Sequence, residues 1–243
     1  MQDFTFNGPL GPIECVVEDN RSKNNAVLVI AHGFRGSRDS GGRALGVAQR
    51  AAASVSVVRF NFTGTQILSL QVAELRAVLT EVRRRWPGCA LYLLGRSLGG
   101  AASIVTAAQE KSLAGLILWA TPHDLRQTFR HVMMDEYYDR LDAGEILHFN
   151  DERGECALTP DFLTDFDKYD LAACLDSLQL PVLLLHCAGD DTVLVEQARQ
   201  NAKVLGSRGE LHIFPGGDHS FTEHSEAAGA LVARWLQQKM SLL

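Results

Sequence analysis

The stretch that decides the fold is Gly95-Arg96-Ser97-Leu98-Gly99-Gly100, which lies between the apolar run Ala90–Leu94 and the small-residue run Ala101–Ala108. Glycines two positions before and after the serine allow neighbouring backbone to pack closely around a sharp turn from strand to helix. Such a turn holds the serine in a strained conformation and exposes its hydroxyl. The pattern GxSxG is common by chance, so its position between a strand and a helix carries the inference. Ser97 is therefore a candidate nucleophile.

Outward from this turn, short apolar runs alternate with helical patterns. The predicted strands are Phe4–Phe6, Ile13–Val17, Ala26–Ala31, Val55–Phe60, Ala90–Leu94, Leu113–Trp119, Val182–His186 and the weaker Glu210–Phe214. The predicted helices are Gly42–Ala52, Leu68–Arg85, Leu98–Glu110, Val193–Leu205 and Thr222–Lys239. This alternation is typical of parallel crossovers with helices on both faces of a sheet. We expect one α/β domain over residues 1–243, with a mostly parallel central sheet flanked by helices.

The segment from Pro122 to Leu178 interrupts the alternation, because it separates two strand candidates without supplying another convincing strand. A structureless loop of that length is unusual inside a compact domain. Apolar side chains recur at helical spacing from Leu125 to Leu141, which predicts a small helical cap inserted at about residues 122–178. Its aromatic and methionine side chains either form a binding pocket or attach the cap to the domain beneath, and both roles are open for different residues.

A serine hydroxyl needs a base to take its proton, and in this architecture the chain order is serine, acid, histidine. An acidic loop with Asp190 and Asp191 follows the penultimate strand candidate, and a loop with His219 follows the last one. Both loops are expected at the carboxyl edge of the sheet, close to Ser97. We take His219 as the base, and spacing alone leaves Asp190 and Asp191 as alternative acids. Among the other histidines, His186 is expected to form a hydrogen bond at the end of a buried strand, and surface or packing positions are expected for His123, His131, His148, His212 and His224.

The turn His32–Gly36 follows the first central strand candidate, where a backbone amide is able to face the serine turn. The amides of Phe34 and Leu98 form the natural pair of donors for a negative charge that develops on a substrate oxygen. The alternative is an ordinary glycine-containing turn. Three nearby arginines either bind an acidic group of a substrate or are solvated: Arg35, Arg38 and Arg96.

Composition excludes several classes of function. The chain has 23 Lys and Arg against 29 Asp and Glu, a formal net charge of −6, which argues against a nucleic-acid partner. No apolar run approaches the roughly 20 residues that span a bilayer, and the first residues lack the pattern of a secretory signal. The 5 cysteines are an odd, widely spaced set without a CxxC pair, so we expect reduced thiols and a cytoplasmic location.

The sequence resembles the α/β-hydrolase superfamily from Ile13 to the last helix. The turn His32-Gly33-Phe34, the segment Arg59-Phe60-Asn61-Phe62-Thr63-Gly64, the glycine-serine turn and the two acid and histidine loops resemble the bacterial feruloyl and cinnamoyl esterase-like group. That group places its acid three residues before Val or Ile and four after a strand-end histidine, which favours Asp190 over Asp191. It often has histidine before the nucleophile, where this chain has Arg96.

These observations predict a serine hydrolase that cleaves a carboxylic ester through an acyl-enzyme. Ser97 attacks the carbonyl, His219 transfers the proton and Asp190 orients His219, while the Phe34 and Leu98 amides bind the oxyanion. The expected substrate is a small-molecule ester, and no metal or organic cofactor is expected. The alternatives are amide, peptide or thioester cleavage by the same residues, or a non-catalytic binding module. The sequence leaves monomer and homodimer open.

Overall fold

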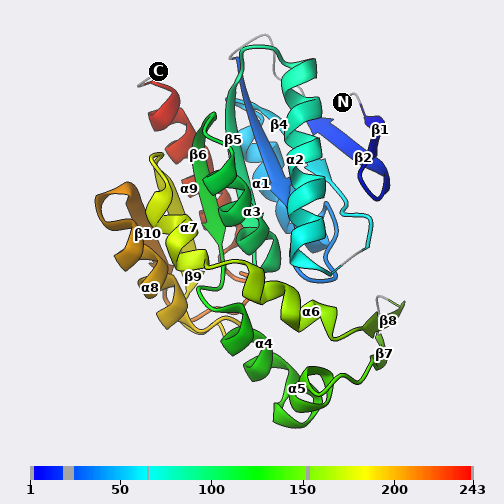
Figure 1. Cartoon of the computed structure of the whole chain (residues 1–243). Helices are drawn as coiled ribbons and strands as arrows, with labels where there is room; N and C mark the ends of the chain where they lie inside the picture. The colour runs from blue at the N-terminus through cyan, green and yellow to red at the C-terminus, as the bar shows by residue number, and fades with distance from the viewer. Residues whose placement is uncertain (1–2, 19–24, 65, 152–153, 242–243) are drawn as a thin grey trace.

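The computed structural model describes residues 3–18, 25–64, 66–151 and 154–241. An eight-stranded sheet in the order β1-β2-β4-β3-β5-β6-β9-β10 forms its centre (Figure 1). The strands are β1 (Phe4–Gly8), β2 (Gly11–Glu18), β3 (Ala26–Ala31), β4 (Ser56–Phe60), β5 (Ala90–Arg96), β6 (Leu113–Trp119), β9 (Val182–Cys187) and β10 (Gly209–Phe214). The pairs β1–β2 and β2–β4 are antiparallel, and all the others are parallel. The predicted α/β class with a mostly parallel sheet is confirmed.

Helices cover both faces of the sheet. One face carries α1 (Arg43–Ala51) and α9 (Ser225–Met240), and the other carries α2 (Leu68–Arg85), α3 (Leu98–Gln109) and α8 (Val195–Leu205). In β3, Val27, Val29 and Ala31 pack against α2 and α3, while the alternate residues pack against α1 and α9. Burial on both faces explains the unbroken apolar run of this strand. Three short 3-10 segments complete the main domain and its insert: η1 (Ser40–Gly42), η2 (Asp165–Lys168) and η3 (Gly206–Arg208).

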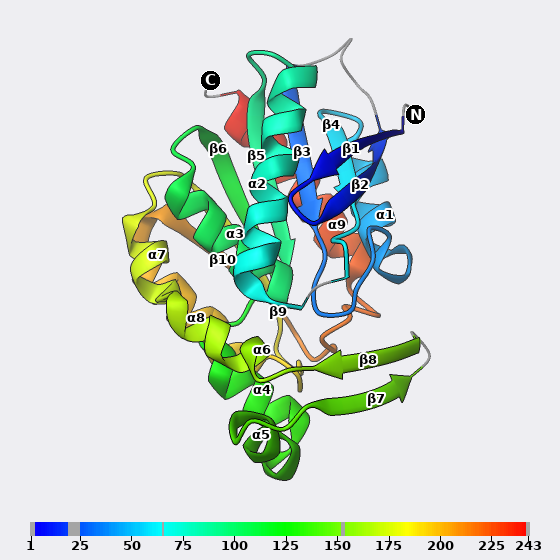
Figure 2. The same ribbon diagram turned by 45° about the vertical axis from the view of Figure 1, so that its right-hand side comes forward.

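The segment after β6 contains helices and a β-hairpin. Its elements are α4 (Leu125–Met133), α5 (Asp135–Asp142), β7 (Leu147–Asp151), β8 (Gly154–Leu158), α6 (Asp161–Thr164) and α7 (Leu171–Ser177). The antiparallel pair β7–β8 runs beneath the sheet in Figure 2. The expectation that this segment holds no strand is wrong. Leu147 pairs with Leu158 and Phe149 with Cys156, and these four side chains pack against the larger core. The charged residues between them hide this short alternation in the sequence.

Two helices begin later than the sequence pattern predicts, because an aspartate binds the backbone amide ahead of each. The amide of Val193 donates to Oδ1 of Asp190 over 2.9 Å. The amide of Thr222 donates to Oδ1 of Asp218 over 2.9 Å. Val193 and Thr222 therefore belong to the loops that precede α8 and α9. Both loops lie at the carboxyl edge of the sheet, and their aspartates fix the backbone there.

No helix within the described ranges combines the length and apolar character that crossing a bilayer requires.

Candidate active site

Ser97 occupies the sharp turn between β5 and α3, with a φ of 53° that side-chain-bearing residues rarely adopt. The glycines around it are required by close contacts. A Cβ on Gly99 would lie 2.1 Å from the carbonyl oxygen of His32, and one on Gly100 would lie 2.0 Å from Oγ1 of Thr121. A Cβ on Gly95 would also clash, because Oγ of a helix serine would be 2.3 Å away. Each of the three glycines in this turn therefore lies too close to a neighbouring group to carry a side chain.

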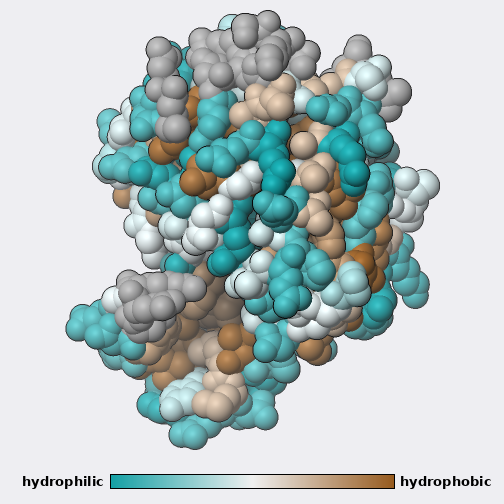
Figure 3. Space-filling model, turned by 180° about the vertical axis from the view of Figure 1, so that it is seen from behind, coloured by the Kyte–Doolittle hydropathy of each residue, from teal (hydrophilic) through white to brown (hydrophobic). Residues whose placement is uncertain are grey.

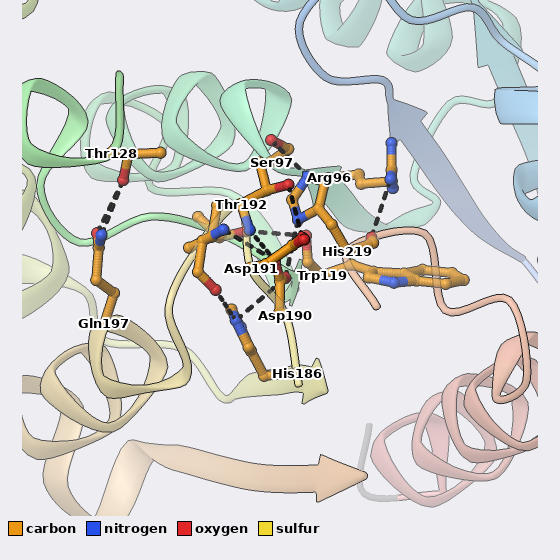
Figure 4. Close-up of polar contacts among 12 residues, drawn as sticks. Arg96, Ser97, Trp119, Thr128, His186, Asp190, Asp191, Thr192, Gln197 and His219 are labelled. Atoms are coloured by element: carbon orange, nitrogen blue, oxygen red, sulfur yellow. Dashed lines mark hydrogen bonds and ion pairs between the residues drawn. The ribbon is translucent and has the colours of Figure 1, made fainter. Parts of the chain in front are cut away.

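Ser97, His219 and Asp190 meet at the carboxyl edge of the sheet, although 122 residues separate the first two (Figure 4). Nε2 of His219 lies 3.1 Å from Oγ of Ser97, and Nδ1 of His219 lies 2.8 Å from Oδ2 of Asp190. The three residues follow β5, β10 and β9, respectively. The structure brings Asp190 to His219, whereas the carboxylate of the exposed Asp191 lies 3.4 Å from the hydroxyl of its neighbour Thr192, and its backbone carbonyl lies 2.8 Å from Nε2 of His131. The three side chains therefore form one hydrogen-bonded chain.

The surroundings of Asp190 hold its carboxylate in place and charged. Besides the amide of Val193, its Oδ1 accepts the amide of Thr192 over 3.0 Å. Burial by itself raises the pKa of Asp190, but the hydrogen bond and charge of His219 and the amide of Val193 outweigh it and bring the pKa below its ordinary value. Asp190 is thus ionised at neutral pH and fixes His219 with Nδ1 protonated and Nε2 free to accept the Ser97 proton.

His186 supports the same loop from below. Its Nε2 lies 2.7 Å from the carbonyl oxygen of Val193 and 3.4 Å from Oδ2 of Asp190. Burial is the main reason that the pKa of His186 is lowered, against the raising effects of the Val193 carbonyl and the Asp190 charge. The neutral ring donates Nε2–H toward both oxygens, so His186 forms the expected hydrogen bond at the end of β9.

The turn after β3 lies against the serine. A Cβ on Gly33 would be 2.9 Å from Cβ of Ser97, so only glycine allows this approach. The buried His32 shapes the turn, because its Nδ1 lies 2.9 Å from the Gly33 carbonyl and its Nε2 accepts the amide of Phe62 over 3.1 Å. Among the described residues, no hydrogen bond uses the amide of Phe34 or of Leu98. Sequence reasoning missed the role of His32, whose only signal is a polar residue directly after a buried strand.

Comparisons with solved structures support the arrangement of the whole chain. Est1E from Butyrivibrio proteoclasticus aligns with a TM-score of 0.81 at 17% identity, covering 98% of this chain and 99% of that one. The esterase domain of a Rhodothermus marinus protein aligns with a TM-score of 0.75 at 19% identity over 98% of both chains. An alpha-beta serine hydrolase homologue from Coxiella burnetii gives 0.72 at 21% identity over 97% of both. The chain has the α/β-hydrolase fold. No protein-family model and no curated protein sequence matches it.

Within this α/β-hydrolase fold, the three arginines named from the sequence make different contacts. Arg96 links the serine turn to the histidine loop, because its Nη2 donates to the backbone carbonyl of His219 over 3.0 Å. Arg35 reaches the hairpin, where its Nη2 donates to the carbonyl of Gly154 over 2.8 Å. Arg38 lies away from the serine and pairs with Glu14 at 3.4 Å. Two of the three therefore serve to hold segments of the fold together around the site.

A cleft of about 910 Å³ contains Ser97 and His219; we call it the central cleft. It continues into an apolar hollow of about 660 Å³, the cap pocket, formed by residues of α4, α5, β7 and β8. Phe34, Phe129 and Val132 line both spaces. Figure 3 shows a hollow between the insert and the main domain, with hydrophobic side chains along it. The ring of Phe129 packs edge-on against Phe34, with centroids 5.4 Å apart.

Metal ligands do not gather anywhere in the described part of the chain, where no group of three or more His, Cys, Asp or Glu side chains is placed to hold an ion.

Proposed function

We propose that the protein is a serine hydrolase that cleaves carboxylic esters. The observation that carries the proposal is the hydrogen-bonded chain from Ser97 through His219 to Asp190 at the edge of an α/β-hydrolase sheet. Esterases and a serine hydrolase homologue among the structures of similar fold support this reaction class. One of those structures contains ferulic acid bound to Est1E, which makes a small aromatic ester a reasonable first substrate to test.

In the acylation step, Oγ of Ser97 attacks the ester carbonyl while Nε2 of His219 takes the hydroxyl proton. The carbonyl oxygen gains the negative charge, which the amides of Phe34 and Leu98 stabilise by two hydrogen bonds. Asp190 keeps the imidazole in the required tautomer and stabilises its charged form. Collapse of the tetrahedral intermediate breaks the bond to the alkoxide, which leaves as the alcohol after His219 returns the proton. The acyl group is now esterified to Ser97.

Deacylation repeats these steps with water. His219 removes a proton from a water molecule, whose oxygen attacks the acyl carbonyl in front of the same two amides. The second tetrahedral intermediate expels Oγ of Ser97, and His219 gives that oxygen its proton back. A carboxylic acid is released and the residues return to their starting state. We further propose that residues 122–178 act as a cap, whose apolar pocket binds one half of the ester.

The test is the change Ser97→Ala, assayed with p-nitrophenyl butyrate. Loss of the nucleophile should lower kcat by about 10⁵ to 10⁶-fold. Ser177→Ala, at an exposed serine that ends α7, should have wild-type turnover. A fluorophosphonate probe should add one label to the wild-type protein at Ser97. Undiminished turnover by the Ser97→Ala protein, purified free of host esterases, would exclude this mechanism, and a folded wild-type protein that takes no label would indicate a binding module.

A further inference from the structure

The central cleft is polar at its second end, opposite the cap pocket. There the wall is formed by Gly41, Arg43, Asp218 and Ser220. Gly41 and Arg43 also line an adjoining groove of about 700 Å³, which extends along α1 as far as Arg50 and borders the first turn of α9. A molecule whose scissile bond lies at Ser97 therefore extends toward apolar side chains in one direction and toward Arg43 in the other.

Arg43 differs from most arginines of this protein in having no acidic partner at contact distance. Among the described residues its side chain forms no ion pair, and its Nε is buried without a hydrogen-bond acceptor. By contrast, Arg50 on the same helix pairs with Glu226 at 3.1 Å, and Arg126 in the insert pairs with two aspartates. Arg43 is half-buried, so its charge is incompletely hydrated and is stabilised by an anion placed beside it.

The carboxylate of Asp218 lines the same end of the cleft, and its pKa is lowered mainly by hydrogen bonds from Thr222 and to a smaller degree by the charge of Arg43. Arg96 lines the same wall, and both arginines border a small enclosed space beside Leu94 and Trp119. Thr222 donates its amide over 2.9 Å and its hydroxyl over 2.6 Å to the Asp218 carboxylate, which forms no ion pair with Arg43 at contact distance among the described residues. Asp191 and Asp218 also line the cleft, so the feature that favours an anion is the pair of guanidinium groups side by side on one wall.

We propose that Arg43 binds an anionic group of the substrate, a carboxylate or a phosphate. The preferred substrates are then esters that carry an apolar part on one side of the scissile bond and an anion on the other. The inference rests on the proposed ester hydrolysis and names its substrate class. A guanidinium suits this role because its planar donors match both kinds of oxyanion. The Phe34 end of the cleft holds the apolar part.

The test compares matched esters that differ in one charge. One pair is 4-carboxyphenyl butyrate and its neutral carboxamide, with the anion in the leaving alcohol. The second pair is hexyl hydrogen succinate and hexyl methyl succinate, with the anion in the acyl part. A third ester, 4-phosphonooxyphenyl butyrate, distinguishes phosphate from carboxylate. The wild-type protein should favour the charged member of at least one pair in kcat/KM, and the variant Arg43→Gln should lower that ratio about ten- to hundredfold.

Each ratio is measured within one protein, so partial loss of folded material cancels. Arg43→Lys should retain part of the preference because it keeps the charge without the planar fork. Arg38→Gln is the matched control, since Arg38 lies outside the cleft and pairs with Glu14, and its ratios should equal those of the wild type. Ratios in both pairs that are the same in wild-type and Arg43→Gln proteins would overturn the proposal.

A binding measurement separates this proposal from the proposed reaction. Calorimetry on the Ser97→Ala protein should show the charged member of at least one pair binding about tenfold or more tightly than its neutral partner. The advantage should disappear in the double variant Ser97→Ala, Arg43→Gln. Equal affinities within both pairs, or an advantage that persists without Arg43, would reject the anion site whatever the turnover assays give. If Ser97→Ala retains turnover, the ester mechanism fails while the binding result still decides the role of Arg43.

Discussion

The sheet edge and the insert line the same cleft but are held together by different interactions. At the sheet edge, Asp190 accepts hydrogen bonds from two backbone amides, and the Gly33 backbone contacts Ser97. A small displacement of either loop would therefore break a hydrogen bond or cause a steric clash. In the insert, Phe129 packs among other aromatic rings, and ion pairs such as Arg126 with Asp167 at 2.7 Å lie largely at the surface. Surface ion pairs contribute little to stability.

This difference indicates that the sheet edge and the insert, which form the two walls of the cleft, have different roles. In the proposed reaction, the sheet edge fixes the distances between Ser97, His219 and Asp190, and every ester requires the same distances. The insert offers apolar surface whose shape depends on side-chain packing, which tolerates substitution better than a backbone contact does. We therefore expect changes at the sheet edge to alter kcat for all esters, and changes in the insert to alter the preference among them.

Among the changes that compare the sheet edge with the insert, the largest effect is expected from Asp190→Asn, which keeps the shape of the side chain but removes its charge. An asparagine no longer holds His219 in the tautomer that accepts the Ser97 proton, so kcat should fall about 10⁴-fold on every ester. Steady-state kinetics with p-nitrophenyl acetate and butyrate would measure it. Asp191→Asn is the matched control at the adjacent exposed position and should keep near wild-type turnover. If Asp191→Asn were instead the inactive variant, the assignment of the acid would be wrong.

A smaller and selective effect is expected in the insert from Val132→Glu. Val132 is 46% exposed at the junction of the central cleft and the cap pocket, so the change leaves the core intact. A charge there should lower kcat/KM for p-nitrophenyl octanoate about tenfold relative to the acetate ester, because the longer chain loses apolar contact. Val132→Thr, similar in shape and uncharged, should lower the ratio less. An unchanged ratio would place the acyl chain outside the cap pocket.

The smallest effect concerns pH and again separates the two walls. Burial lowers the pKa of His32 and His186 below the ordinary value of 6.5. Below about pH 6.5 the unfolded chain therefore binds more protons than the folded protein, and the free energy of unfolding decreases as the pH falls. Thermal unfolding between pH 8 and pH 5 should show this slope. The variant His186→Gln should reduce this dependence of stability on pH. The control His148→Gln, at an exposed position of the insert hairpin, should leave the dependence unchanged. Parallel curves of stability against pH for His186→Gln and wild type would contradict the role assigned to His186.

The sequence predicted the sheet well because its signals are local. Strands such as β3 are buried on both faces, so every position must be apolar. The glycines around Ser97 form a short pattern that is visible in the sequence, although the contacts that require Gly99 and Gly100 are with His32 and Thr121, which are distant along the chain. The hairpin β7–β8 was not predicted from the sequence because only alternate side chains of each strand are buried, and charged residues lie between the apolar residues of the two strands. Its pairing also depends on the core beneath it, which the sequence does not display.

The site was predictable in its residue types and less so in its contacts. The order of serine, acid and histidine followed from chain topology, and the structure places Ser97, Asp190 and His219 within hydrogen-bonding distance. The choice between the two adjacent aspartates required a family resemblance, since both occupy the same loop. The contact from Arg96 to the His219 carbonyl joins residues 123 positions apart, and no local pattern reveals such a bond.

One side chain beneath the insert has a practical consequence for protein engineering. The Oε1 of Gln197, on α8, accepts the amides of His123 and Asp124 over 2.8 and 2.9 Å, and its Nε2 donates to the hydroxyl of Thr128 over 2.8 Å. The same glutamine thus sets the direction in which the chain leaves β6. A chimera that transplants a foreign insert onto this scaffold should keep residues 122–128 together with Gln197, and place its first junction after them.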